Sequence, residues 1–502
     1  MIQKYKLASA SRIKNATTGA PYQFEIGQML SYNTDATLVS LKICVKMKRV
    51  QTNSKLVERG DIFIGIPCAS LAEHIEEAIR NGASITFAEG YSENQAVVPV
   101  RDARLLASRL AKFTYNEQPE CCVALTGTNG KSSTAHFLRQ IWGQSGKLSA
   151  NLGTCGLFIA DQNVVPPSIH VPTLTTPDPI TLHMIMKYLY QNNVTHLVFE
   201  ASSPALDQKR LHSVELSAAA FTNLASDHID YHGTADAYFR AKLLLFEEIL
   251  PRDRPAVVSA DHSVVYDAVS KLNNNIITFG LSLNNFIRAE NVVVSRDGTS
   301  FDLICGKKRF NEIHVDLLGK FQIMNLMCAV ATAYACGTRI DTILNALRAV
   351  YAADGIMEYV RTVNGGDVYV DFAHTAEGLA EALRCFREIC RRRLICVFGC
   401  GGDRDRSKRA TMGRIANELA DIVIVTDDNP RLEDPAAIRA SIIEQCPGAI
   451  EIWDRREAIY HAIGLIEPGD IVAIMGKGHE NYQTYNTESK HFNDKEEILE
   501  RR

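Results

Sequence analysis

One segment of this chain constrains its fold more than any other. Residues 122–125 (CVAL) are typical of a buried strand and lead directly into residues 126–133 (TGTNGKSS), which an apolar-periodic helix follows. Strand, glycine-rich turn and helix thus succeed one another in the order that a nucleotide site requires. Backbone N–H groups of small residues can close around phosphate oxygens, and the helix N-terminus adds positive potential. The segment predicts a nucleotide-binding α/β unit.

The loop also supplies the side chains that such a site needs. Lys131 can neutralise β/γ-phosphate charge, and the hydroxyl that follows it can hold Mg²⁺. Leu125 stands where the generic phosphate-loop pattern has a glycine, so the match to that pattern is imperfect. We expect ATP to contact Gly127, Thr128, Asn129, Gly130, Lys131, Ser132 and Ser133.

The length favours more than one domain. At roughly 150 residues per domain, 502 residues favour about three. Short apolar runs alternate with helical patterns in a small unit from residue 60 onward, in the unit around the loop, and again from residue 368. This alternation favours parallel sheets and an α/β fold. We expect domains at 1–120, 121–352 and 353–502, the second a phosphate-loop ATPase with a mostly parallel sheet and the third Rossmann-like.

Charge and composition exclude several classes of protein. Lys+Arg 54 against Asp+Glu 58 leaves a net charge of -4, so no global basic field favours nucleic acid. No apolar run approaches the roughly 20 residues of a membrane span, and the N-terminus lacks a signal-peptide core. The 13 cysteines have no metal-ligand spacing and fit reduced core thiols. We expect a cytoplasmic monomer, with a solvated N-terminal extension that carries Lys4, Lys6, Arg12 and Lys14.

Several blocks besides the loop resemble the Mur ligases, ATP-dependent amide-forming enzymes of peptidoglycan synthesis. These blocks are Thr175-Thr176-Pro177, Glu200-Ala201-Ser202-Ser203 with Gln208 and Arg210, and residues 221–233 (FTNLASDHIDYHG). The resemblance runs in the family's order from about residue 60 to residue 483. It implies that UDP-MurNAc-L-Ala-D-Glu is extended through an acyl phosphate. It also assigns substrate contacts to Ser54, Thr175, Thr176, Ser202, Gln208 and Arg210.

The resemblance further implies a magnesium site. Glu200 at a strand end and His228 in an acid-rich turn match family residues that serve Mg²⁺, together with Ser132. Lys242, taken on its sequence alone, fits a surface lysine whose apolar stem lies along the protein. The family's lysine at this position is instead carbamylated and acts as a metal ligand, and we expect that modification here. The resemblance thus gives Lys131, His228 and Lys242 catalytic roles.

The third unit contains a second glycine-rich turn, residues 399–405 (GCGGDRD), which also suggests a dinucleotide site. Its third glycine position is unfilled and its charge is dense, so we favour an amino-acid crevice at the strand ends. Arginines can clamp a carboxylate, and Glu480 can meet an ammonium group. Asp-Asn-Pro-Arg marks family members that select meso-diaminopimelate. The crevice comprises Arg404, Asp428, Asn429, Pro430, Arg431, Gly476 and Glu480.

Two further residues match family positions near the nucleotide, Asn325 and Asp371. The chain also departs from the family pattern. Ile356 stands where an arginine near the nucleotide is expected, and Pro204 stands where a histidine is usual. Of the Asp-Ser-Arg block that is usual in the first domain, this chain keeps only the serine, Ser54. A lysine-adding enzyme, a folate-polyglutamylating enzyme and a non-catalytic nucleotide-binding protein are the alternatives.

Overall fold

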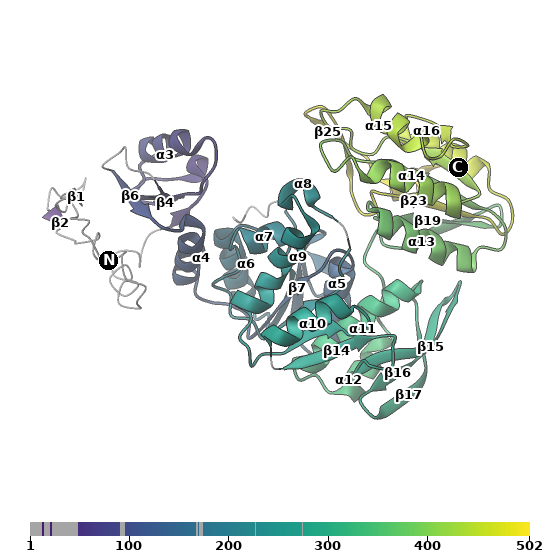
Figure 1. Ribbon diagram of the computed structural model, residues 1–502, viewed down its shortest axis with the longest axis horizontal. Coiled ribbons are helices and arrows are strands. Elements are labelled where there is room, and N and C mark those ends of the chain that lie inside the picture. Colours follow the sequence, from purple (N-terminus) through teal and green to yellow (C-terminus); the bar gives the residue numbers. More distant parts are fainter. Residues whose placement is uncertain are drawn as a thin grey trace.

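The computed structural model describes residues 49–90, 96–166, 169, 174–225, 227–273 and 275–501, and the backbone of 13–14 and 21–22. Figure 1 shows three bodies along the chain, with the purple N-terminal part on one side, the teal central part next to it and the yellow-green C-terminal part beyond. Strands β1 (Ile13–Lys14) and β2 (Pro21–Tyr22) pair antiparallel. Lys4, Lys6 and Arg12, which we assigned to a solvated extension, lie outside the described residues.

The N-terminal part is a small parallel sheet in the order β3-β4-β5-β6. Its apolar residues Ile62, Ile64 and Phe87 pack with α4 and with Ile180 of the central part, so one core spans the junction. Its elements are β3 (Val50–Gln51), the 3-10 turn η1 (Ser54–Leu56), β4 (Ile62–Gly65), α3 (Leu71–Arg80), β5 (Ile85–Glu89), β6 (Val97–Val100) and α4 (Ala103–Thr114).

The central part is built on an eleven-stranded sheet, within the described residues, in the order β10-β9-β8-β11-β7-β12-β13-β14-β15-β16-β17. Pairings from β8 to β15 are parallel, and the outer pairings are antiparallel. The strands are β7 (Cys121–Thr126), β8 (Ser149–Gly153), β9 (Gly156–Ile159), β10 (Gln162–Asn163), β11 (His196–Glu200), β12 (Ala218–Phe221), β13 (Ala256–Ser259), β14 (Ile276–Gly280), β15 (Ile287–Ser295), β16 (Gly298–Cys305) and β17 (Lys308–Val315).

Helices cover both faces of this sheet because the central strands are apolar on both sides. Val123 and Leu125 of β7 pack toward α5 and α11, whereas Cys122 and Ala124 pack toward α6 and the segment after α9. The helices are α5 (Lys131–Gln144), α6 (Pro179–Gln191), α7 (Ser203–Asp207), α8 (Ile229–His232), α9 (Ala235–Leu244), the π-helical turn η2 (Leu245–Ile249), α10 (Ser263–Leu272), α11 (Lys320–Ala335) and α12 (Ile340–Leu347).

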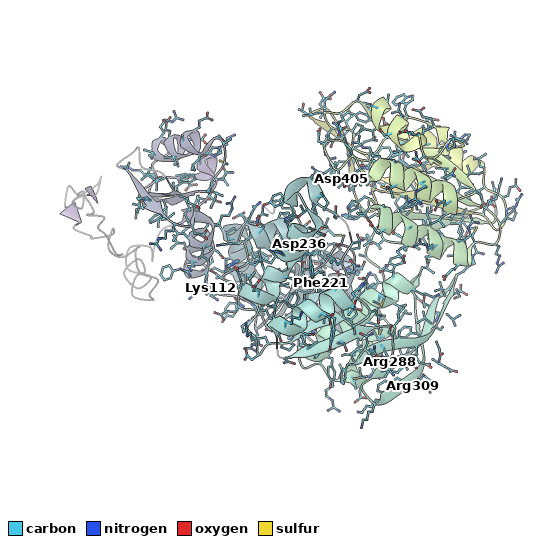
Figure 2. All side chains as sticks on the ribbon, viewed as in Figure 1. Lys112, Phe221, Asp236, Arg288, Arg309 and Asp405 are labelled. Carbon is cyan, nitrogen blue, oxygen red and sulfur yellow. The ribbon has the colours of Figure 1, made fainter. Side chains whose placement is uncertain are left out.

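The antiparallel extension β15–β17 was not predicted from the sequence. Its burial alternates along β15, as expected for strands with one solvated face. On that face Arg309 bonds Asp302 at 2.9 Å and also pairs with Glu290, which Arg288 contacts at 2.8 Å. Figure 2 labels Arg288 and Arg309 at this outer end of the sheet. Cross-strand ion pairs thus replace apolar contacts where the sheet leaves the core.

The C-terminal part is a doubly wound sheet in the order β18-β19-β23-β20-β21-β22, parallel except for the edge strand β18. Buried residues line both of its faces. Its elements are β18 (Glu358–Val363), β19 (Gly366–Asp371), α13 (Ala376–Ile389), β20 (Leu394–Phe398), α14 (Lys408–Leu419), β21 (Ile422–Val425), α15 (Pro435–Ile443), β22 (Ile450–Glu451), α16 (Arg455–Gly464), β23 (Ile471–Met475), the hairpin β24 (Tyr482–Tyr485) and β25 (Glu488–His491), and α17 (Asp494–Glu500).

The predicted fold class, α/β with mostly parallel sheets, is confirmed by this architecture. In both large sheets the turns that carry the predicted site residues follow the carboxyl ends of parallel strands. Ligands of open α/β sheets bind at such ends. In the described ranges no helix is long and apolar enough to cross a membrane.

Candidate active site

A cleft of about 670 Å³ lies between the central and C-terminal parts. It is lined from one side by residues of the phosphate-loop helix, of the turns after β8 and β12 and by the last residue of β11, and from the other by the turns after β20, β21 and β23. Figure 2 labels Asp405, one of the lining residues, at the edge of the C-terminal part that faces the central helices. The cleft brings together nine predicted site residues: Ser132, Glu200, His228, Arg404, Asp428, Asn429, Arg431, Gly476 and Glu480.

Glycine is required at two positions of the phosphate loop. Gly127 has φ 143° and Gly130 has φ 79°, both in the range that side chains rarely adopt. A Cβ at Gly127 would lie 1.9 Å from Thr222 Oγ1, and one at Gly130 would lie 2.1 Å from Asn325 Oδ1. Asn325, predicted to be near the nucleotide, therefore packs directly against the loop.

The turn after β12 fixes the shape of the loop from outside. Asn223 accepts hydrogen bonds from the Thr128 amide, through its carbonyl at 2.9 Å, and from the Asn129 amide, through Oδ1 at 2.8 Å. Thr222 Oγ1 donates to the Asn129 carbonyl at 2.7 Å. Residues 222–223, which carry part of the family resemblance, thus hold the loop.

Two lysines converge on one carbonyl of the loop. Lys131 Nζ lies 3.0 Å from Gly127 O and 2.7 Å from Thr128 O, and Lys242 Nζ donates to Gly127 O at 2.7 Å. Burial lowers the pKa of Lys131, and burial together with the Lys131 charge lowers the pKa of Lys242 well below its ordinary value. Lys242 is only 1 % exposed, so the interpretation of it as a surface lysine is wrong.

The carboxylate of Glu200 lies at the start of α5. It is 3 % exposed, and its Oε1 accepts from Ser132 Oγ at 2.8 Å and from the Thr154 amide at 3.0 Å. Thr154 Oγ1 donates to Oε2 at 3.2 Å and also lies 3.1 Å from Thr175 Oγ1. A hydroxyl and a carboxylate are hard oxygen donors, which fit Mg²⁺ together with phosphate oxygens and water. These two residues could therefore hold such an ion.

His228 also lines the cleft from the central part, at the N-terminus of α8, with φ 51°. Burial lowers its pKa, and the neighbouring Asp227 carboxylate opposes that shift. Its Nε2 is 3.6 Å from Asp227 Oδ2. Within the described ranges no group of three or more His, Cys, Asp or Glu side chains is arranged to hold a metal ion.

The residues assigned to the acyl substrate form one hydrogen-bonded cluster. Thr176 Oγ1 donates to the Glu200 carbonyl at 2.8 Å and to Ser202 Oγ at 3.1 Å. Arg210 donates to the Thr176 carbonyl at 2.6 Å and to Gln208 Oε1 at 2.8 Å. This cluster shares Glu200 with the phosphate loop, so the two predicted subsites adjoin.

The crevice predicted to bind an amino acid contains a further cation, Lys477. Lys477 is 0 % exposed, and its Nζ donates to Glu480 Oε2 at 3.0 Å and to the Tyr482 carbonyl at 2.6 Å. Asn429 Nδ2 donates to the same Glu480 oxygen at 2.9 Å. The position of Lys477 in the turn after β23, beside Gly476, was the feature of the sequence that could have identified it. Lys477 fixes the carboxylate of Glu480 and neutralises part of its charge.

The other crevice residues surround this group. Arg431 has φ 52°, and its Nη1 donates to the Gly402 carbonyl at 2.8 Å. Arg404 lines the cleft and donates to its neighbour, the Asp403 carbonyl, at 3.2 Å. A Cβ at Gly476 would lie 3.1 Å from Asp428 Oδ2. Pro430 joins Asn429 to Arg431, and its carbonyl packs against Gly402.

Ser54 and Asp371 are among the predicted site residues that do not line the cleft. Ser54 is buried in the N-terminal part and donates to Glu77. Asp371 accepts from the amides of Met357, at 2.8 Å, and Ala373, at 2.7 Å, and burial raises its pKa to about 6. Asp371 thus orders the strand that enters the C-terminal part.

The position of Ile356 is also away from the cleft lining, to which Ala353 and Asp354 contribute. A lysine that the sequence analysis left unassigned, Lys408, does line it, and its Nζ donates to the His374 carbonyl at 2.7 Å. The feature of the sequence that could have identified Lys408 was the dense charge after the second glycine-rich turn. Lys408 supplies a cation on the C-terminal side of the cleft.

The fold and the cleft define a phosphate-loop nucleotide-binding protein whose substrate crevice is shared with a second, doubly wound unit. The family model "Mur ligase middle domain" matches residues 125–333, and the model "Mur ligase, glutamate ligase domain" matches residues 357–478. The chain belongs to the Mur ligase family.

Relatives named UDP-N-acetylmuramoyl-L-alanyl-D-glutamate--2,6-diaminopimelate ligase align over most of the chain. The one from Rhizobium meliloti (strain 1021) is 41% identical over 90% of this chain and 94% of its own length. The one from Anaplasma marginale (strain St. Maries) is 37% identical over 89% and 94%. These likenesses extend well beyond the two family models.

Solved structures have a similar fold. A structure of a ligase with that same name is 30% identical, with TM-score 0.64, over 90% of this chain and 93% of its own. MurF ligase from Thermotoga maritima in complex with ADP matches with TM-score 0.62 at 17% identity, over 86% and 94%, and shows the fold alone.

Proposed function

We propose that this chain is an ATP-dependent ligase of peptidoglycan precursor synthesis in the cytoplasm. It joins the D-Glu γ-carboxylate of UDP-MurNAc-L-Ala-D-Glu to the amine of meso-2,6-diaminopimelate and releases ADP and phosphate. The observation that carries the proposal is the single cleft in which Ser132 and Glu200 face the crevice of Asn429, Arg431 and Glu480. The names of the relatives support the same substrates.

The reaction begins at the carboxylate. A carboxylate oxygen is a poor leaving group, so the γ-phosphoryl group of ATP is transferred to it and gives an acyl phosphate. Gly127 to Ser133 hold the triphosphate by backbone amides, and Lys131 counters its charge as it turns from the loop carbonyls. Mg²⁺ bound at Ser132 and Glu200 would supply further charge neutralisation for the phosphoryl group.

Lys242 is the residue proposed to carry a carbamate. Its lowered pKa favours the neutral amine, which is the form that reacts with CO₂. The modification would replace this buried amine beside Lys131 with an anion. The result would be a favourable pair of opposite charges at Gly127 instead of two amino groups on one carbonyl.

The crevice orients the attacking amine. Arg431 and Arg404 bind the distal carboxylate of diaminopimelate, and Glu480, fixed by Lys477 and Asn429, binds an ammonium group. The other amine, once neutral, attacks the acyl carbon and expels phosphate. Closing the cleft on both substrates protects the acyl phosphate from water.

The uridine end is proposed to lie at the N-terminal part, with Ser54 on its side. Thr175, Thr176, Ser202, Gln208 and Arg210 bind the muramyl dipeptide. We propose three domains, 1–120 for the UDP substrate, 121–352 for ATP and 353–502 for the amino acid, in a monomer.

The test is an incubation of the purified protein with ATP, Mg²⁺, UDP-MurNAc-L-Ala-D-Glu and either diaminopimelate or lysine. We expect phosphate release that depends on diaminopimelate. Amine-independent or absent release would contradict a ligase and favour a nucleotide-binding protein. Faster turnover with lysine would overturn the amine specificity.

A further inference from the structure

Helix α4 of the N-terminal part runs along residues 209–215 of the central part. Three contacts mark the junction: Asp102 with Lys209 Nζ at 2.5 Å, Ser108 Oγ with the Ser213 amide at 3.1 Å, and Lys112 with Glu215 at 2.7 Å. Figure 2 labels Lys112 where α4 meets the central helices. Because Lys209 adjoins Arg210, the first turn of α4 lies beside the acyl-substrate cluster.

Arg104 occupies that first turn, and one nitrogen of its guanidinium group is unsatisfied within the described residues. Its Nε is buried without a hydrogen-bond partner in the part of the chain that the structure describes. Three acidic residues of this region already have other hydrogen-bond or ion-pair partners. Asp102 pairs with Lys209, and Asp207 accepts from Tyr231 Oη at 2.9 Å. Asp178 caps α6 through the amides of Ile180 and Thr181.

The charge of Arg104 acts on the same cluster. Burial lowers the pKa of Arg210, and the charge of Arg104 adds to that shift against the opposing charge of Asp178. Burial raises the pKa of Tyr231, and the charge of Arg104 opposes that shift. Two guanidinium groups therefore lie near each other, and the acids around them have other partners. Such an arrangement is stabilised by an anion that binds both cations.

We propose that Arg104 binds the diphosphate of the UDP-linked substrate at the junction of α4 with residues 209–210. This inference rests on the proposed function. The diphosphate joins uridine, on the Ser54 side, to the muramyl dipeptide, on the Thr176 and Arg210 side, so it has to cross this junction. It is also the part of that substrate with the highest negative charge. Arg104 makes recognition of the substrate depend on both parts of the protein.

The variant that tests this is Arg104→Met, which keeps the apolar stem of the side chain and removes the charge. Arg109→Met is the matched control, because Arg109 is an exposed arginine on the same helix. Calorimetric titration with UDP, uridine and UDP-free muramyl dipeptide separates the phosphate contribution from the others. We expect R104M to weaken UDP binding about tenfold or more and to leave uridine and the UDP-free dipeptide unchanged. R109M should bind all three as the unaltered chain does.

Steady-state kinetics give a second readout. R104M should raise KM for the UDP-substrate by a similar factor and leave kcat and the KM values for ATP and diaminopimelate unchanged. An R104M chain that binds UDP like the control overturns the proposal, as does an unaltered chain that does not bind UDP. Equal weakening of the UDP-free dipeptide would assign Arg104 to a carboxylate instead. UDP binding is measured without turnover, so a failed ligase assay overturns only the proposed function. Thermal unfolding of each variant shows whether a change reflects folding.

Discussion

Ser132 Oγ donates to Glu200 Oε1 at 2.8 Å and thereby joins the first turn of α5 to the carboxyl end of β11. The two residues are 68 positions apart, and parallel pairing of β11 with β7 brings them together. This contact places a hydroxyl and a carboxylate at the point where the phosphate loop meets the acyl-substrate cluster.

Replacing Glu200 with Gln tests the proposed magnesium role. The amide can still accept from Ser132 and Thr154 but carries no charge, so the fold should persist while activity falls about a hundredfold or more. Phosphate release measured across a magnesium titration should show a higher half-saturating concentration. Glu247→Gln, in the turn after α9, serves as a control. An unchanged magnesium dependence in E200Q would remove Glu200 from the site.

Lys242→Ala should reduce activity to a similar extent, and short carboxylic acids should partly restore it by replacing the carbamate. No such rescue would count against the modification. Lys187→Ala, which removes only a half-exposed ion pair with Glu117, should remain active.

The modification should also depend on pH in a defined direction. Carbamate formation consumes the neutral amine and releases a proton, so occupancy falls as the pH falls. Because burial lowers the pKa of Lys242, the neutral form is available well below the ordinary lysine range. A carbamate signal in ¹³C NMR after addition of labelled bicarbonate, lost on acidification and regained on return, checks this.

Arg431 should determine the choice of amine. Arg431→Ala removes the guanidinium beside Asn429 and should raise KM for diaminopimelate about 10- to 100-fold, as expected for a lost charge-assisted hydrogen bond. KM for ATP should not change, and discrimination against lysine should shrink because lysine lacks the distal carboxylate. The exposed Arg414, which pairs with Glu418 on α14, provides the control variant Arg414→Ala. Unaltered discrimination in R431A would place carboxylate recognition elsewhere.

The buried His183 should lower the free energy of unfolding as the solution becomes acidic. It is fully buried in α6, neither ring nitrogen has a partner within the described ranges, and burial lowers its pKa to about 3. The unfolded chain therefore binds a proton below about pH 6.5 that the folded chain rejects, and this group's stability contribution is lost as the pH falls. At about 1.4 kcal/mol per pH unit, the loss reaches about 2 kcal/mol at pH 5.

The variant His183→Leu lacks the titrating ring and should lose less stability between pH 7 and pH 5 than the unaltered chain. Urea denaturation at both pH values measures this difference. An equal loss in both proteins would show that His183 does not contribute.

Local chemistry made much of this protein predictable from the sequence. Residues 122–133 specify a buried strand, a tight turn and a helix start through neighbouring residues alone, and β7 and α5 confirm them. The strand-end turns of the C-terminal part were equally predictable, because parallel strands place their carboxyl ends along one edge. The sequence pattern did not predict β15–β17, whose alternating residues lie on an exposed extension of the sheet.

Burial and long-range pairing were decided only by the tertiary structure. Lys242 lies on a helix whose sequence allows an exposed face, and packing of α9 under the phosphate loop buries it against Gly127. Nothing in the sequence indicated that Lys477 is buried, or that the charge of Arg104 acts on Arg210 from another part of the chain. The sequence by itself determined the site turns, the buried parallel strands beside them and the family, because these depend on neighbouring residues. Which charges are buried, paired or left unpaired depends on residues far apart in the chain, and only their packing decides it.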